Sequence, residues 1–376
     1  MAPEVFWYIN PTDGDVPWEP ALRVEPTLEV IRHQAQTLDR LGFSGALTTA
    51  REPIALVPGT DNLRFLIPVY PGVKPPAQLA EEAQVFDQYS GGRRIFNQVN
   101  GADPVLARYG RRESKAERYR LSAEYWRQVK RLYADETEAY DGEFFSYGPR
   151  YKPAIPGPRQ PGGIEVWGTG ASPEGIWHAA EVLDVYLSFM APPSELTGLF
   201  DRVRAAASER GRTLRFGVLA SVIVRETDDE AWERFESQLS RTRPETVLAT
   251  ADRNLRSFGF PGLGEISSDD PQVQGRIDAL RAGRIPGREL LEYAPNMAAG
   301  LTTWTAAEPP FDIAGKGTGT YFVGSAGNVA ATMNSLAEQA GIDIWILSGW
   351  PLAAEAEIAA DLLLPLLRNP ATTAVA

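Results

Sequence analysis

The sequence contains no cysteine and only two histidines among its 376 residues. Without thiols there are no disulfides, thiolate zinc sites, iron–sulfur clusters or cysteine nucleophiles. His33 and His178 are too few for a multi-histidine metal centre, and each falls within a helical pattern where a structural role is the simpler interpretation. A chain this poor in nucleophiles and soft ligands suits chemistry performed by a bound organic cofactor. We therefore predict no metal site.

Positive charge is also scarce. The chain has 37 Lys and Arg against 49 Asp and Glu, which gives a formal net charge of −12. Such a surface repels nucleic-acid backbones and anionic membranes. No stretch reaches the ~18 unbroken apolar residues of a membrane span, and the start MAPEVFWYIN lacks the pattern of a signal peptide. We expect a cytoplasmic protein that binds neither nucleic acid nor membranes.

What the chain does contain is a regular alternation of short apolar runs with longer amphipathic segments. Near-continuous apolar runs are typical of parallel strands covered on both faces. One of the helical segments opens with Ser114 and carries Glu117 three residues later, which predicts a capping box. The predicted strands are Val5–Asn10, Gly45–Ala50, Arg64–Tyr70, Arg94–Asn100, Ile164–Gly168, Val185–Phe189, Phe216–Val224 and Asp343–Gly349.

Eight such strands separated by helices predict an α/β fold of the (β/α)8 TIM-barrel type. A doubly wound open sheet uses the same alternation and is the competing fold. The barrel is favoured because no GxGxxG follows the first strand, where the sequence reads INPTDGDVPW. No Pro/Gly-rich linker divides the chain either, so we predict a single domain over residues 1–376.

The long span between the seventh and eighth predicted strands breaks this regularity. It is rich in Gly, Pro and Arg, and long connections in compact domains are usually functional or disordered. We predict an insertion that forms a lid at about residues 242–328. Within it, Gly315–Thr320 holds three glycines, which suits a loop that closes over a pocket. A surface insertion without a role is the alternative.

Two strand ends carry residues suited to a ligand. In WGTGASP, small residues lie between a strand and a helix start, where free N–H groups and the helix dipole could hold a phosphate. In NQVNG, the amides of Asn97 and Asn100 are expected on one side of the strand, where a heteroaromatic ring could pair with them. The alternatives are a turn kept small for packing, and amides that bond the neighbouring backbone.

Taken in order, these strand ends resemble the bacterial-luciferase-like flavin monooxygenases, with the alkanesulfonate monooxygenases nearest. The resemblance runs from FWYINPTDGD to ILSGWP and includes DRLGFSGAL, FDQYSGGRRIFNQVNGADP, ERYRLSAEYW, FGVLASVIVRETDDEAW and NMAAG. It implies a TIM barrel, reduced FMN as cosubstrate and O₂ as oxidant. It also implies a separate NAD(P)H-dependent flavin reductase and a homodimeric or homotetrameric assembly.

The resemblance also implies a set of cofactor-binding positions. The NQVNG strand would lie beside the flavin ring, and Asn100 stands where the family usually has a threonine. Tyr119 of the ERY motif matches a tyrosine that contacts the flavin phosphate, and the turn after the fifth strand matches the phosphate-holding turn. The residues so assigned are Asn97, Val99, Asn100, Tyr119, Gly170, Ala171 and Ser172.

The substrate side departs from the sulfonate enzymes. Leu219 and Ser221 stand where those enzymes have an arginine and a histidine, and Leu352 replaces another histidine. An arginine fork and a histidine are the groups that would hold a buried sulfonate. Arg51 or Lys316 could instead have taken over anion binding, which is the alternative. The predicted pocket residues are Asp13, Arg51, Phe189, Leu219, Ser221, Lys316, Trp350 and Leu352.

The resemblance therefore implies a two-component monooxygenase that uses reduced FMN and O₂ through a flavin peroxide. We expect its substrate to be a small organic molecule other than a simple alkanesulfonate. Two other functions remain open: an oxidoreductase of the same fold that uses the deazaflavin F420, and a flavin-binding protein without catalysis. No catalytic residue is assigned.

Overall fold

The computed structural model describes residues 3–49, 53–100, 106–149, 160–257, 261–300 and 319–367. The pairing of eight parallel strands forms a closed ring, and each of the eight overlaps a predicted strand. In ring order each strand pairs with the next, and the last pairs again with the first. The ring strands are β9 (Arg215–Arg225), β13 (Ile344–Ser348), β1 (Glu4–Ile9), β2 (Gly45–Thr48), β3 (Arg64–Val69), β4 (Arg94–Gln98), β7 (Val166–Gly168) and β8 (Val185–Phe189). The predicted (β/α)8 barrel is confirmed.

Helices connect the ring strands, and several begin at caps that the sequence itself encodes. Ser114 and Glu117 form the predicted capping box, and Thr227 with Glu230 forms another. The helices outside the long insertion are α1 (Leu28–Arg40), α2 (Pro76–Ser90), α4 (Lys115–Tyr133), α5 (Pro173–Val182), α6 (Pro193–Ser208), α7 (Asp228–Ser240), α11 (Ala326–Ala340) and α12 (Leu352–Leu362). Single 3₁₀ turns occur at Pro20–Leu22, Pro53–Leu56 and Leu364–Leu366.

The chain divides into two compact units. Unit 1 comprises Met1–Phe43, Phe189–Thr197 and Gly217–Ala376, and unit 2 comprises Ser44–Ser188 and Gly198–Phe216. That the whole chain is one domain stays a prediction.

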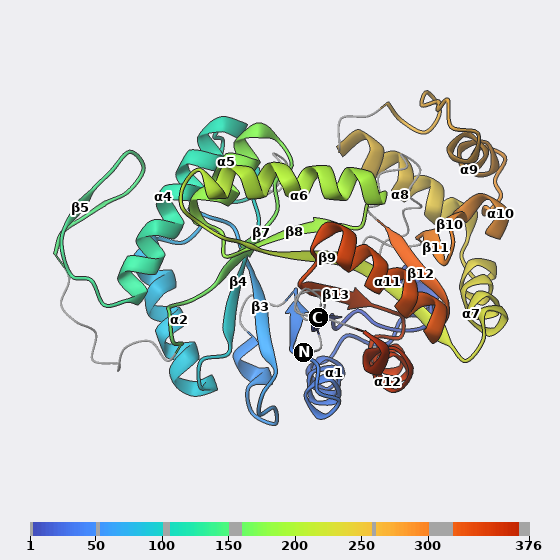
Figure 1. Ribbon diagram of the computed structural model, residues 1–376, viewed down its shortest axis with the longest axis horizontal. Helices are drawn as coiled ribbons and strands as arrows, with labels where there is room; N and C mark the ends of the chain where they lie inside the picture. Colours follow the sequence, from blue (N-terminus) through green and yellow to red (C-terminus); the bar gives the residue numbers. More distant parts are fainter. Residues whose placement is uncertain are drawn as a thin grey trace. The chain divides into compact units, whose positions relative to one another are not determined.

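In unit 2, α2 and α4 lie side by side against one face of β3 and β4 (Figure 1). Phe96 of β4 packs on Trp126 of α4, with ring centroids 5.1 Å apart. Because strand side chains alternate, Asn97 points to the opposite face, toward the interior of the barrel. After α4 the chain forms a small hairpin of β5 (Tyr140–Asp141) and β6 (Ser146–Tyr147).

In unit 1, β1 lies beside β13, which in turn lies beside β9. The Trp7 indole contacts Phe43 edge-on and donates a hydrogen bond to the Leu352 carbonyl at 3.0 Å. Trp7 therefore faces the helix layer, and its neighbour Tyr8 faces the barrel interior.

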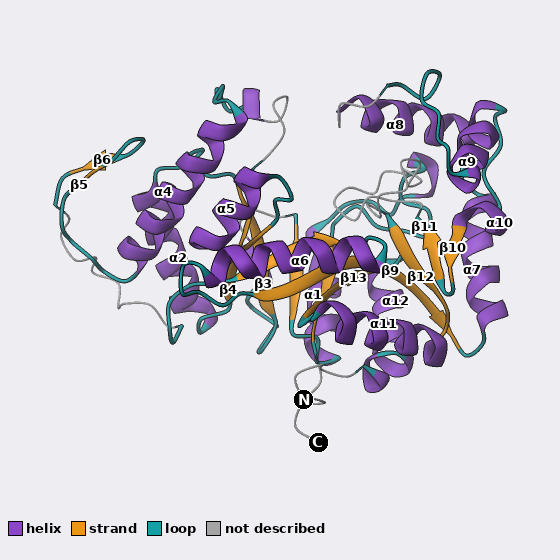
Figure 2. Cartoon of the chain, turned by 45° about the horizontal axis from the view of Figure 1, so that its top comes forward, coloured by secondary structure: helices purple, strands orange, loops and turns teal. Residues whose placement is uncertain are grey.

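The span between β9 and β13 holds more regular structure than the sequence predicted. The last strand of this span pairs in parallel with the second half of β9, from Tyr321 beside Ser221 to Ser325 beside Arg225 (Figure 2). The elements are α8 (Pro244–Ser257), α9 (Pro271–Arg281), α10 (Arg288–Leu291), β10 (Glu292–Ala294), β11 (Met297–Ala299) and β12 (Thr320–Ser325). Residues 301–318, and with them most of the Gly315–Thr320 loop, lie outside the described residues, so the lid stays a prediction. Within the described ranges, no helix is both long and apolar enough to cross a membrane.

Candidate functional site

The carboxyl ends of β4 and β7 form the first part of the candidate site, in unit 2. Asn97 lies in register with Trp167, one residue before the end of β4. Asn97 is 8% exposed, and its side chain makes no hydrogen bond to any described residue. A nearly buried amide of this kind needs partners. Asn97 is therefore placed to bind a ligand that enters the barrel from this end.

The turn after β7 is the second part. Gly170 has a φ of +154°, and a Cβ there would lie 2.9 Å from the Gly175 Cα and 3.2 Å from the Tyr119 hydroxyl. The Tyr186 hydroxyl donates to the Gly170 carbonyl at 3.1 Å and so holds the turn. Ser172 caps α5 by accepting from the Gly175 N–H at 3.2 Å. Tyr119 and the turn therefore lie together, and the absence of a Cβ at Gly170 is what allows Gly175 and Tyr119 to pack this closely on it.

The Tyr119 ring packs against a buried histidine. It lies 5.6 Å from the ring of His178, whose Nε2 is 2.8 Å from the Ser122 hydroxyl. Burial, with a smaller contribution from Arg127, lowers the pKa of His178 to about 3. His178 is therefore neutral, and it is a packing residue, as its helical pattern predicted. The Tyr119 hydroxyl makes no hydrogen bond to a described residue.

One expectation for this edge is wrong. β4 ends at Gln98, so Asn100 is not on the strand and does not share a face with Asn97. Residues three apart on a strand would face opposite sides in any case. Instead, the Gln98 Nε2 donates to the Asn100 Oδ1 at 2.5 Å, while the buried Asn100 Nδ2 and Gln98 Oε1 lack partners. Half-buried Val99 continues the pairing by donating its N–H to the Val69 carbonyl at 2.9 Å.

Unit 1 contains most of the predicted substrate residues. Leu219 and Ser221 of β9 are buried, and Ser221 lies 2.8 Å from the Ser348 hydroxyl of β13. Leu219 is in register with Ile346, and Phe6 of β1 pairs with the same residue from the other side. These side chains face the barrel interior, because Trp7 faces the helices. Phe189, at the end of β8, is half-buried.

Trp350 and Leu352 flank the turn that leads from β13 into α12. Trp350 is 1% exposed, contacts Tyr8 edge-on at 6.1 Å, and has no hydrogen-bond partner for its indole N–H. Leu352 is fully buried at the start of α12.

The Asp13 carboxylate is occupied by hydrogen bonds within the protein. It accepts from the Leu352 N–H at 3.0 Å, the Gly14 N–H at 2.7 Å and the Gln34 Nε2 at 2.8 Å. Burial raises its pKa, and these hydrogen bonds partly oppose the rise. With its acceptor positions occupied, Asp13 caps α12 rather than facing a substrate.

The arginines beside this turn are also paired with other groups of the protein. Arg225 binds Glu355 with both terminal nitrogens, at 2.9 and 2.8 Å. Arg234 donates to Glu355 at 3.2 Å, to the Trp350 carbonyl at 2.6 Å and to Asp15. Arg241 also pairs with Asp15. The arginines of this turn therefore bind carboxylates of the chain itself.

Arg51 and Lys316, the two cations predicted for the pocket, lie outside the described residues. Sequence reasoning missed Arg111 and Arg118, which line a small hollow beside Asn100 and Leu121 at the ends of β3 and β4. The signal was a run of basic residues in YGRRESKAERYR.

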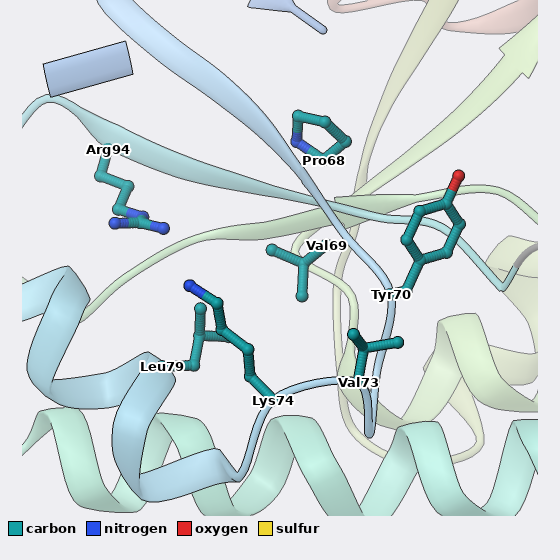
Figure 3. A pocket seen from close by; sticks show the side chains of 7 residues that line it. All are labelled: Pro68, Val69, Tyr70, Val73, Lys74, Leu79 and Arg94. Carbon is teal, nitrogen blue, oxygen red and sulfur yellow. The ribbon is translucent and has the colours of Figure 1, made fainter. Parts of the chain in front are cut away.

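The other cavities of unit 2 lie away from these residues. Figure 3 shows Lys74 and Arg94 reaching into a cavity of about 40 Å³ between β3, β4 and α2. It is far below the roughly 300–1,000 Å³ of a ligand pocket, and the Lys74 ammonium pairs with Glu82 at 2.5 Å. A wider hollow of about 530 Å³, beside Tyr89 and Arg93, lies near the amino ends of the strands. In barrels that face serves stability rather than catalysis.

The chain is similar in sequence to a known protein family and in fold to several solved structures. A sequence profile of the luciferase-like monooxygenases matches residues 13–344. A riboflavin lyase, crystallised with modified FMN and riboflavin, and a long-chain alkane monooxygenase each superpose with a TM-score of 0.74 at 18% identity, covering 97% of this chain and 91% of theirs. The F420-dependent tetrahydromethanopterin reductase of Methanopyrus kandleri has a TM-score of 0.63 at 13% identity, covering 98% of this chain and 100% of its own. At these identities the superpositions show the shared fold, and the profile match shows the family. The resemblance predicted from the strand ends is confirmed: this chain belongs to the luciferase-like monooxygenase family.

Proposed function

We propose that this chain is the oxygenating component of a two-component monooxygenase, which uses reduced FMN and O₂ on a small organic substrate. A separate NAD(P)H-dependent flavin reductase would supply the reduced FMN, and the chain would work as a homodimer or homotetramer. The observation that carries the proposal is that the Asn97 amide near the end of β4 and the Tyr119 hydroxyl beside Gly170 make no hydrogen bond to a described residue.

The residues of this edge fit a flavin mononucleotide. A flavin ring carries both donors and acceptors, which is what the solitary amide of Asn97 requires. The turn from Gly168 to Ser172 opens α5, and a helix start favours a phosphate through its N–H groups and dipole. The Tyr119 hydroxyl beside Gly170 would donate to that phosphate, and the missing Cβ of Gly170 lets the turn pack closely on Gly175 and Tyr119.

When bound, reduced FMN supplies the activation of O₂. The protein's own part is to bind, orient and exclude water. Asn97 would fix the ring from the barrel interior, and Tyr119 with Ser172 would fix the phosphate end. In unit 1, the buried Leu219 and Trp350 offer an apolar interior, and apolar surroundings protect a reactive species from water.

The unit 1 residues support a substrate other than a simple alkanesulfonate. A buried sulfonate requires charged hydrogen-bond donors. Arg225 and Arg234 already bind Glu355, and Ser221 binds Ser348. Among the described residues predicted for the pocket, Leu219, Phe189 and Trp350 are apolar or aromatic and suit an apolar or flat aromatic group.

Fold likeness to an F420-dependent reductase favours a second candidate, hydride transfer with a deazaflavin. Both cofactors carry a phosphate, so the Gly170 turn suits either. A flavin-binding protein without catalysis is the third possibility.

One experiment separates these functions. The protein is titrated anaerobically with oxidised and reduced FMN, and with F420, and then mixed with air. We expect tighter binding of reduced than of oxidised FMN, and a slower reoxidation of the bound flavin than of free flavin. Substrate consumption is then tested with a flavin reductase, comparing alkanesulfonates with neutral sulfur compounds, aromatics and aldehydes. Equal affinity for both redox forms of FMN, or preferential binding of F420, would contradict the proposal.

A further inference from the structure

A basic segment stands out in this acidic protein. Residues 106–120, LARYGRRESKAERYR, hold six cationic side chains and two acidic ones, a local charge of +4 in a chain of net charge −12. The segment forms the last part of the connection between β4 and α4, and it continues into the start of α4. We call these residues the basic segment. Its charge opposes that of the rest of the chain, so it attracts the anions that the whole surface repels.

The basic segment adjoins the Gly170 turn. Lys115, the first residue of α4, pairs with Glu174 in the first turn of α5, at 3.7 Å. Tyr119, one turn further along α4, lies against Gly170. Arg111 and Arg118 line the hollow beside Asn100. All of these residues belong to unit 2, so their neighbourhood is defined within one compact body.

The acidic side chains of the basic segment are already engaged. Glu113 pairs with Arg111 at 2.7 Å, and the Glu117 carboxylate accepts from the Ser114 N–H at 2.9 Å and the Ser114 hydroxyl at 2.6 Å. Arg120 pairs with Glu143 at 3.0 Å, and Arg118 donates to the Glu113 carbonyl at 3.1 Å. The other two cations, Arg108 and Arg112, are exposed and make no hydrogen bond or ion pair with described residues. Two exposed guanidinium groups therefore lie in the segment that leads into α4, the helix whose Tyr119 contacts the turn.

We propose that the basic segment is an electrostatic capture surface that draws the phosphate of the soluble flavin toward the Gly170 turn. The inference rests on the proposed function and adds how the cofactor is collected. A cosubstrate that is released and rebound in every turnover must reach its site by diffusion each time. Near neutral pH its phosphate carries a charge close to −2. Arg108 and Arg112 act on the encounter rather than on the bound state, so they set the association rate and leave the dissociation rate nearly unchanged.

The test compares two flavins that differ in the phosphate. Reduced FMN and reduced riboflavin are mixed anaerobically with the protein in a stopped-flow instrument, and binding is followed by quenching of the tryptophan fluorescence. We expect the FMN association rate to fall as ionic strength rises from about 0.02 M to about 0.5 M, because the Debye length shortens from tens of ångströms to a few. The riboflavin rate should not change.

The variant pair is matched for net charge. Arg108→Gln with Arg112→Gln should slow FMN association about three- to tenfold at low salt, since steering by a charged surface is worth about 10- to 1,000-fold in all. Arg32→Gln with Arg284→Gln removes the same charge from unit 1, and should leave the rate within about twofold if the effect is local. Riboflavin should bind both double variants at the wild-type rate.

Three results would overturn the inference. The first is an FMN association rate that does not depend on salt, and the second is an equal slowing in both double variants. The third is normal FMN association in the Arg108/Arg112 variant with turnover lost only when the reductase supplies the flavin, which would make the surface a protein docking site. If neither flavin binds wild-type protein, the proposed function itself fails. If both flavins bind and the salt effect is missing, only the capture surface fails.

Discussion

Asp13 accepts a hydrogen bond from the backbone N–H of Leu352 at 3.0 Å, although 339 residues separate them in the sequence. The bond joins the loop after the first ring strand to the start of the last helix. It gives α12 the cap that Pro351 cannot provide, since the Pro351 side chain makes no capping hydrogen bond. Both residues were predicted to contact substrate, and their bond gives them a structural role.

Replacing Asp13 with alanine should therefore lower stability. The change leaves the N–H groups of Gly14 and Leu352 and the amide of Gln34 without their acceptor, and we expect a loss of about 2–4 kcal/mol in the free energy of unfolding. Urea denaturation measures it. The control is Asp201→Ala, an exposed carboxylate, with an expected change within about 0.5 kcal/mol. If stability is unchanged and substrate binding is weakened, Asp13 contacts the substrate and the structural role is wrong.

Acid should destabilise the protein through His178. Its pKa of about 3 in the folded state lies below the ordinary value of 6.5, so between these values the unfolded chain binds one more proton and stability falls as the pH falls. From neutral pH to about pH 5 this amounts to about 2 kcal/mol. His178→Gln should lose less stability than wild type over this range in denaturation curves. His33→Gln, at the other and exposed histidine, should follow wild type.

Gly170→Ala should weaken flavin binding. The new Cβ would lie 2.9 Å from the Gly175 Cα, at a φ that L-residues rarely adopt, so the turn must move. We expect at least a roughly tenfold loss of FMN affinity, about 1.4 kcal/mol. The matched control is Gly198→Ala, at an exposed position of α6 with open space around it, which should keep affinity and raise helix stability slightly. Affinities that agree for the two variants would show that the phosphate binds elsewhere.

Short alkanesulfonates should be poor substrates. Burying a sulfonate beside Leu219 and Ser221 without a charged partner costs several kcal/mol, and each ~1.4 kcal/mol is tenfold in binding. Sulfite release is measured with FMN, a flavin reductase and a graded series of sulfonates, against a blank without the protein. Saturable sulfite release at micromolar sulfonate would show that other cations hold the anion.

Local sequence determined much of this fold. The ring strands could be predicted because each is a short apolar run whose burial on both faces shows in its own residues. The Ser114–Glu117 cap could be predicted because both partners lie within one helical turn. Small residues in the turn after β7 likewise marked a place where backbone is exposed.

Tertiary structure alone decided the rest. β12 becomes a strand because the far half of β9 offers it a free edge, and nothing in TYFVGS states that this edge exists. Asp13 and Asn97 look alike in sequence as polar residues at strand ends. One is satisfied by Leu352 and Gln34, and the other is left without a partner, because hydrogen bonding depends on which distant groups the fold brings within reach.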